Sequence, residues 1–92
     1  MHTTFKEYLE AEGSRYTTQK KSIVNAIAKT KHHFEVEEFI ASLHKKDKNF
    51  SRSTIYRTIK QLLDAKLLQK ISTQDGKVYY EQTFDKKRHA HL

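Results

Sequence analysis

The chain has 92 residues, of which 18 are Lys or Arg and 11 are Asp or Glu, so it is expected to form one small domain with a formal net charge of +7. This balance favours a polyanionic partner over an acidic substrate. The lack of cysteine excludes a disulfide, a thiolate nucleophile and a cysteine-ligated metal site within the chain. Because apolar runs are short and the first residues lack the apolar core of a signal peptide, we expect a soluble, cytoplasmic protein with no membrane partner.

The first two predicted helices follow from apolar residues spaced three and four apart. Phe5, Tyr8 and Leu9 share one helix face and predict a short helix that ends where Gly13 stands. A second helix is expected after Thr17, which is a suitable N-cap residue. Its apolar stripe consists of Ile23, Val24, Ile27 and Ala28.

Two further amphipathic helices are expected in the middle of the chain. The third follows the loop His32-His33, and its apolar stripe consists of Val36, Phe39, Ile40 and Leu43. A basic loop over residues 44–49 comes next, and Ser51 can cap a fourth helix. The stripe of that helix is the clearest helical pattern in the chain and consists of Ile55, Ile59, Leu62 and Leu63.

From Leu68 onward the apolar period changes from 3.6 to 2, which is typical of β-strands. β-Prone residues lie on both sides of Asp75-Gly76, and this pair favours a tight type I′ turn with positive φ at both positions. We therefore expect a hairpin with strands over residues 68–73 and 78–80. Helices closed by such a hairpin predict a mainly α fold with a small β-hairpin wing, a winged helix-turn-helix.

The polar face of the fourth helix carries the strongest indication of function. Opposite the apolar stripe it places Ser53, Tyr56, Arg57 and Lys60, near the end of the helix that enters the major groove in helix-turn-helix proteins. Residues 45–60 contain six basic residues and one acid, a net charge of +5. Together with Arg15, Lys20 and Lys21, they are expected to form a surface that faces phosphates. A charged helix face is often simply solvated, and an alternative for Tyr56 is to cover the edge of the hairpin. A large aromatic beside Arg57 on this face nevertheless favours contact with a nucleic acid.

The chain has six histidines, and two of them form the His-x-His motif of His89 and His91. In an extended segment, residues i and i+2 point the same way, so both imidazoles can bind one metal ion. Glu81 lies upstream, at the end of the predicted hairpin, and a third imidazole would complete a site. A His-x-His near a chain end is also often merely exposed, so the motif alone leaves both interpretations open.

Five segments occur in an order and spacing that resemble a known family. They are Arg15-Tyr16-Thr17-Thr18-Gln19-Lys20, His32-His33, the run from Ser51 to Ile59, the Asp75-Gly76 hairpin ending in Tyr80-Glu81, and His89-Ala90-His91-Leu92. Together they resemble the N-terminal domain of the ferric uptake regulator family of metal-responsive repressors. The resemblance covers nearly the whole chain, and it implies a transcriptional regulator that is not an enzyme.

The resemblance implies that Tyr56 and Arg57 contact base edges and backbone in the major groove of double-stranded DNA. Arg15 stands where the family has a basic residue that reaches the minor groove of A·T-rich DNA, whose narrow shape attracts a guanidinium. Thr54 is expected to contact the DNA backbone or to cap the helix. The set of residues expected at the DNA is completed by Ser53 and Lys60.

The resemblance also implies a regulatory metal site formed by His33, Glu81, His89 and His91, with His32 as an alternative to His33. The other two histidines, His2 and His44, are expected to be solvated. Three imidazoles and one carboxylate suit Fe(II) or Zn(II), and Mn(II) is a further candidate. Such a site would join the DNA-binding body to the segment that follows it. Metal would then favour one orientation of the two parts, and DNA would tighten metal binding to the same degree.

Family members continue beyond the His-x-His-Leu motif into a second domain that dimerises. We accordingly expect a winged-helix DNA-binding domain over residues 1–84 and, over residues 85–92, a hinge that leads to a missing dimerisation domain. The full-length protein would bind palindromic, A·T-rich operators as a homodimer, and this fragment would be a monomer. The chain departs from the family at Phe34-Glu35, where a small polar helix cap is usual, so we expect the third helix to start less well capped. It also departs at Lys66, where a glycine usually ends the fourth helix, so we expect a side chain in a left-handed turn there.

Two other functions are open from the residues alone. A winged-helix module without metal sensing could bind an acidic protein or RNA through the same basic face. A small metallo-hydrolase could use His89, His91 and Glu81, but the sequence has no glycine-rich loop or second acid with which to build a catalytic cleft. Salt dependence and sequence preference of nucleic-acid binding would distinguish the DNA-binding function from these alternatives.

Overall fold

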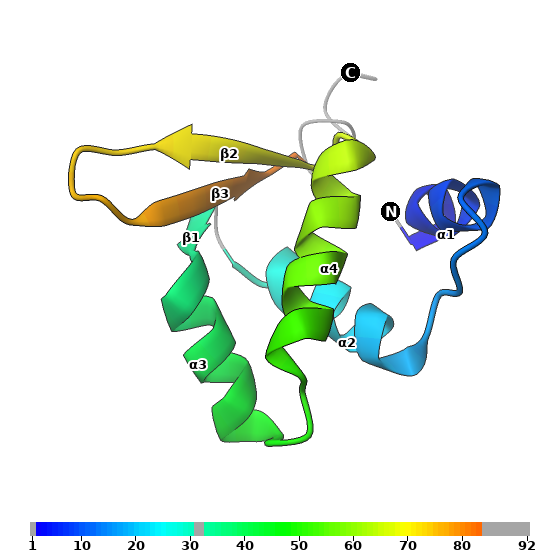
Figure 1. The fold of residues 1–92 in the computed structure, drawn as a ribbon, viewed down its shortest axis with the longest axis horizontal. Helices are drawn as coiled ribbons and strands as arrows, with labels where there is room; N and C mark the ends of the chain where they lie inside the picture. Colours follow the sequence, from blue (N-terminus) through cyan, green and yellow to red (C-terminus); the bar gives the residue numbers. More distant parts are fainter. Residues whose placement is uncertain (1, 31–32, 84–92) are drawn as a thin grey trace.

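Four α-helices and a three-stranded antiparallel sheet make up residues 2–30 and 33–83, the part of the chain that the computed structural model describes (Figure 1). The helices are α1 (His2–Ala11), α2 (Thr18–Ala28), α3 (Val36–Lys46) and α4 (Arg52–Asp64). The strands are β1 (His33–Glu35), β2 (Leu68–Ser72) and β3 (Val78–Gln82), in the sheet order β1-β3-β2. The predicted mainly α, winged-helix fold is confirmed. The predicted hinge over residues 85–92 lies outside the described residues.

One apolar cluster joins the helices to the sheet, and α4 runs through the middle of the molecule with the wing extending from its C-terminal end (Figure 1). The predicted stripes of α3 and α4 are buried, apart from the half-buried Leu63. In α2 the stripe is narrower than predicted, because the helix ends at Ala28 and leaves that residue exposed. Within the described ranges, no helix combines the length and apolar character needed to cross a bilayer.

Side-chain caps start α2 and α4 as predicted. Thr17 Oγ1 accepts a hydrogen bond from Lys20 N at 3.2 Å, and the Thr17 backbone is extended. Ser51 Oγ accepts one from Thr54 N at 3.4 Å. Each hydroxyl satisfies one of the backbone N–H groups that a helix start leaves without a partner.

The start of α3 is capped better than predicted. The Glu35 carboxylate accepts hydrogen bonds of 2.9 Å from both Glu37 N and Glu38 N. The expectation that this helix start is poorly capped is therefore wrong. A carboxylate offers two acceptor oxygens, and its negative charge is stabilised by the positive end of the helix dipole.

α4 ends in a left-handed turn at Lys66, whose φ is 65°. Lys66 N donates to Leu63 O at 3.0 Å and Leu67 N donates to Leu62 O at 2.9 Å, which is the Schellman pattern that closes a helix. The expected left-handed backbone is confirmed. A side chain in this conformation costs about 1 kcal/mol relative to glycine.

The wing is a hairpin whose loop is wider than predicted. Ser72 pairs with Val78, so residues 73–77 form the loop. Gly76 has a φ of 77°, but Asp75 does not have positive φ, so the predicted type I′ turn is wrong. The Asp75 carboxylate organises the wider loop by accepting hydrogen bonds from Thr73 Oγ1, Lys77 N and Tyr79 OH. These bonds, the one from Thr73 first, hold the pKa of Asp75 below its usual range.

Two other elements differ from the prediction. β1 was not predicted, because its three residues are too few to show a period and it exists through pairing with β3. α3 continues to Lys46, so the predicted loop over residues 44–49 begins later than expected. The residues before α4 are therefore a short connection between two helices.

Candidate nucleic-acid interface and metal ligands

The outer face of α4 carries most of the residues predicted at the DNA. Ser53, Arg57 and Lys60 are exposed, and Thr54 is half-buried at the edge of this face. Tyr56 is 37% exposed, a fraction that no other large hydrophobic side chain in the described ranges reaches. The opposite face of the helix is buried in the core, which fixes the direction in which these side chains point.

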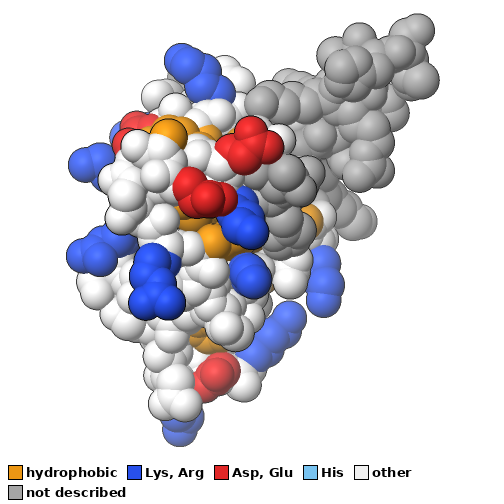
Figure 2. Space-filling view, turned by 90° about the vertical axis from the view of Figure 1, so that its right-hand side faces the viewer, with side chains coloured by type: hydrophobic (Ala, Val, Ile, Leu, Met, Phe, Trp, Pro, Cys, Tyr) orange, Lys and Arg blue, Asp and Glu red, His pale blue; other side chains and the backbone are white. Residues whose placement is uncertain are grey.

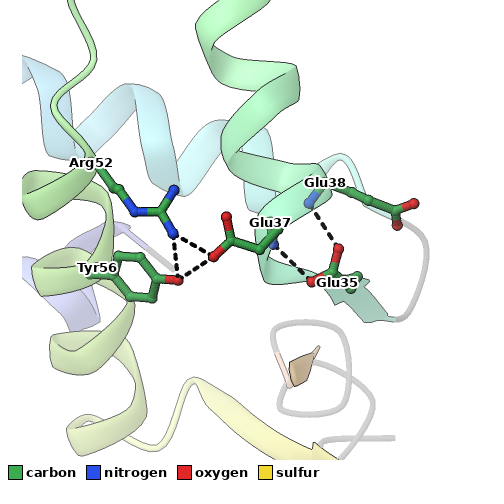
Figure 3. Close-up of polar contacts among 5 residues, drawn as sticks. All are labelled: Glu35, Glu37, Glu38, Arg52 and Tyr56. Atoms are coloured by element: carbon green, nitrogen blue, oxygen red, sulfur yellow. Dashed lines mark hydrogen bonds and ion pairs between the residues drawn. The ribbon is translucent and has the colours of Figure 1, made fainter. Parts of the chain in front are cut away.

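Tyr56 is held by a cluster that links α4 to the start of α3 (Figure 3). Its phenol donates a 2.7 Å hydrogen bond to Glu37 Oε2. Arg52 Nη2 lies 2.6 Å from the same oxygen, and the guanidinium lies over the Tyr56 ring at 5.2 Å from its centroid. The Tyr56 hydroxyl therefore already has a partner, Glu37 of α3, in the free protein.

The cluster has a clear electrostatic signature. The hydrogen bond from Arg52, followed by the one from Tyr56, lowers the pKa of Glu37. The hydrogen bond to the Glu37 carboxylate raises the pKa of Tyr56. Sequence reasoning assigned neither Arg52 nor Glu37 to the site. Arg52 had a local signal, since it lies one helical turn before Tyr56, but Glu37 comes from another helix and had none.

A polar pocket of about 470 Å³ lies between the start of α2 and the outer face of α4. Three of the predicted DNA contacts line it, namely Arg15, Thr54 and Arg57. The other lining residues are Ser14, Thr17, Gln19 and Lys20. The structure thus brings Arg15, which precedes α2, next to Arg57, which is 42 positions later in the chain.

Lys20 is the least exposed residue of this pocket, with 8% of its surface accessible. Burial lowers the pKa of its ammonium, and repulsion from the Arg57 guanidinium lowers it further. Sequence reasoning placed Lys20 only among general phosphate-facing residues. Its burial had no signal in the sequence, because a lysine on an amphipathic helix is normally solvated.

Basic and acidic side chains are mixed on one side of the molecule. Figure 2 shows the side of the molecule on which α1 lies, where Lys and Arg side chains are spread across the surface with acidic side chains among them. Glu7 and Glu10 of α1 and Glu12, just after this helix, are all exposed. The pocket between α2 and α4 is different, since its seven lining residues include three cations and no acid.

Two of the four predicted metal ligands lie opposite each other in the sheet. His33 of β1 is the direct cross-strand partner of Glu81 of β3, so their side chains stand on the same face. His33 is exposed, with its ring 6.0 Å from that of Tyr79. Among the described residues, no group of three or more potential metal-binding side chains is found. The other two predicted ligands, His89 and His91, and the alternative His32 lie outside the described residues.

His44 differs from the solvated histidine that we expected. Its ring is half-buried, and Nε2 lies 2.8 Å from the carbonyl oxygen of Phe50. This contact ties the last turn of α3 to the connection before α4. His44 therefore has a structural position, away from the strands that carry His33 and Glu81.

Sequence and fold both match one family of proteins. The model of the ferric uptake regulator family matches residues 11–92. A ferric uptake regulation protein from Rhizobium leguminosarum bv. viciae is 34% identical over 89 residues, which are 97% of this chain and 62% of that protein.

Solved structures agree with this match. A manganese uptake regulator gives a TM-score of 0.68 at 32% identity, over 85% of this chain and 57% of its own. A zinc-bound manganese uptake regulator gives 0.69 at 33% identity, over 86% and 60%. The Helicobacter pylori ferric uptake regulator, whose structure reveals three functional metal-binding sites, gives 0.72 at 25% identity, over 84% and 51%. This chain thus spans between 51% and 62% of the length of these relatives. The chain belongs to the ferric uptake regulator family, whose members are metal-responsive transcriptional regulators and not enzymes.

Proposed function

We propose that this chain is the DNA-binding part of a metal-responsive transcriptional repressor, with α4 as the helix that enters the major groove. The observation that carries the proposal is the outer face of α4, where exposed polar side chains stand beside the cationic pocket formed with α2. A face of this kind offers hydrogen-bond donors to base edges and positive charge to the phosphates on either side.

The residues divide into readers and positioning contacts. Tyr56 and Arg57 project from the middle of the exposed face and would contact base edges. Ser53, Thr54 and Lys60 would contact the backbone, since short hydroxyls and a point charge position the helix without reading sequence. Arg15, on the segment before α2, would reach a narrow minor groove beside the site.

For metal sensing, we propose His33, Glu81, His89 and His91 as the ligands. The adjacency of His33 and Glu81 across β1 and β3 supports half of this set, because one imidazole and one carboxylate already share a face of the sheet. Fe(II), Zn(II) and Mn(II) are all compatible with imidazole and carboxylate ligands. The bound ion would tie the segment that carries His89 and His91 to the sheet, and so bias how the DNA-binding part is held.

We also propose the kind of operator and the oligomeric state. The full-length protein would bind a palindromic, A·T-rich operator in the cytoplasm as a homodimer, because two-fold symmetric half-sites require two reading helices. The present chain alone would be a monomer. It would then bind one half-site weakly, through contacts that one α4 can make.

A titration of labelled duplexes tests this function. An A·T-rich palindrome and a scrambled duplex of equal length are titrated by fluorescence anisotropy at two salt concentrations, each with and without Zn(II) or Mn(II). We expect a preference for the palindrome that persists at the higher salt concentration and increases with metal. Equal binding to both duplexes that salt abolishes would contradict sequence reading, and would favour a winged-helix module for an acidic protein or RNA.

A further inference from the structure

The pocket between α2 and α4 has an unbalanced charge. Its seven lining residues supply one ammonium and two guanidinium groups, from Lys20, Arg15 and Arg57, but no carboxylate. Within residues 2–30 and 33–83, no ion pair joins a carboxylate to Arg15, Lys20 or Arg57. The cations of the pocket are therefore not neutralised by a paired carboxylate in this part of the protein.

Lys20 is a largely buried lysine that lies beside another cation. It is 92% buried and lies close enough to Arg57 for their repulsion to lower its pKa further. A cation that is partly shielded from water beside another cation is unfavourable, because it loses part of its hydration without gaining an opposite charge. Within the described ranges, no acceptor is hydrogen-bonded to the Lys20 ammonium, which keeps some contact with solvent in the pocket. An anion in the pocket would supply both the acceptor and the missing charge.

The groups around Lys20 suit an oxyanion. Thr17 and Thr54 bring hydroxyls, and the start of α2 brings backbone N–H groups that have no partner within the helix. The positive end of the helix dipole acts in the same direction. The cations and these donors reach the pocket from three parts of the chain, namely α2, α4 and the segment between α1 and α2.

We propose that this pocket holds a phosphodiester group of the DNA backbone, with the Lys20 ammonium as its counter-charge. The proposal rests on the proposed function and deepens it. Arg57 belongs both to the pocket and to the exposed face of α4. A phosphate in the pocket would therefore lie beside the bases that α4 faces. Lys20 would thus be a positioning contact, which fixes the register of α4 on the duplex without reading sequence.

The proposal is tested with two variants that each lose one positive charge. Both are titrated with the palindromic and scrambled duplexes at several salt concentrations. Lys20→Met keeps an unbranched apolar stem and removes the charge, and Lys29→Met makes the same change at the exposed C-terminal end of α2. The slope of log K against log salt is negative, and we expect Lys20→Met to make it less steep by about 0.9. If the two proteins bind equally at 1 M salt, the variant then binds roughly eightfold more weakly than the wild type at 0.1 M. Both duplexes should lose the same factor, and Lys29→Met should change the slope much less.

A pH series adds a readout that a purely structural role of Lys20 would not give. In the free protein the Lys20 pKa is lowered, and a bound phosphate would raise it again by stabilising the ammonium. Binding would then take up a proton at pH values between these two pKa values, so affinity should fall as pH rises through the lowered pKa. Lys20→Arg stays charged and should bind at neutral pH while losing this fall. Thermal melts of each variant check that it is folded.

The outcomes separate this proposal from the proposed function. If Lys20→Met behaves like Lys29→Met while Arg57→Ala abolishes the preference for the palindrome, the function stands and the phosphate pocket is wrong. If the wild-type chain does not prefer the palindrome but Lys20→Met still lowers the salt slope, the pocket stands and sequence reading is wrong. A titration with inorganic phosphate, followed by the amide signals of residues 17–20, provides the last arm. Saturation at low phosphate concentration, with DNA binding unaffected by Lys20→Met, would overturn the assignment to a DNA phosphate.

Discussion

The phenol of Tyr56 donates a 2.7 Å hydrogen bond to Glu37 Oε2, the same oxygen that lies 2.6 Å from the Arg52 guanidinium (Figure 3). A residue at the start of α3 thus holds two side chains of α4 in the free protein. DNA would place phosphates and base edges near this face, where the carboxylate repels phosphate and competes for both donors. Glu37 is therefore expected to oppose DNA binding while keeping Tyr56 in a defined position.

Replacing Glu37 by Gln should strengthen binding to both duplexes several-fold, because the repulsion between the carboxylate and phosphate disappears. It should also lower the pKa of Tyr56, since the hydrogen bond to the carboxylate is the main cause of its raised value. Anisotropy titrations and the absorbance of tyrosinate measure the two effects. Glu38→Gln is the matched control, because Glu38 is exposed on the next position and should leave the Tyr56 pKa unchanged. Weaker binding in Glu37→Gln would instead mean that the cluster pre-orients Tyr56 for its contact.

Arg57→Ala should weaken specific binding by about 1–3 kcal/mol, the usual effect of losing a bidentate base contact. The loss should be larger for the palindrome than for the scrambled duplex. Both duplexes lose the attraction between the guanidinium and phosphate, but only the palindrome also loses a specific base contact. Lys60→Ala, on the same exposed face, serves as a comparison and should weaken both duplexes alike. An unchanged affinity in Arg57→Ala, measured by anisotropy, would remove Arg57 from the interface.

His33→Ala should lower the affinity for Zn(II) or Co(II) by at least about tenfold while leaving the helices intact, since His33 is exposed on a three-residue strand. Competition with a chromophoric chelator measures the affinity, and circular dichroism measures the fold. His44→Ala is the control, because His44 contacts the Phe50 carbonyl and not the sheet. If both variants retain the same metal affinity, His33 is not a ligand.

Lys66→Gly should raise the free energy of unfolding by about 0.5–1 kcal/mol, because glycine adopts the observed left-handed φ of 65° without a steric penalty. Lys66→Ala tests the cause, since alanine keeps the Cβ atom and should bring no such gain. Urea unfolding with a common m-value gives both numbers. Equal stability of the two variants would point to the lysine charge and away from the backbone.

Gln82→Ala should lower the free energy of unfolding by about 1–3 kcal/mol, the penalty for leaving buried polar groups without a partner. The Gln82 Nε2 group is within hydrogen-bond distance of Ile27 O at 3.1 Å, Thr30 O at 2.6 Å and Thr30 Oγ1 at 3.0 Å, so it joins the end of β3 to the end of α2. Thermal melting measures the loss, and Gln69→Ala on exposed β2 is the control. Similar melting temperatures for the two variants would show that these bonds contribute little net stability.

Features that depend on neighbours along the chain were predictable. The helices follow from the spacing of apolar residues, and the caps Thr17 and Ser51 follow from hydroxyls that meet the nearby backbone. The left-handed turn was expected because Lys66 stands where the family usually has a glycine. The direction of the α4 face was also predictable, because burying one stripe turns the opposite one outward. Family membership followed from motifs whose order is itself a property of the sequence.

Features that depend on contacts between distant residues needed the tertiary structure. β1 forms only through its pairing with β3, and that pairing is what sets His33 opposite Glu81. The link from Glu37 to Tyr56 joins two helices, and the burial of Lys20 beside Arg57 arises where α2 meets α4. Local sequence determines which face an element presents, because its period is built into the backbone. Packing alone decides which faces meet, and so which charges end up beside each other.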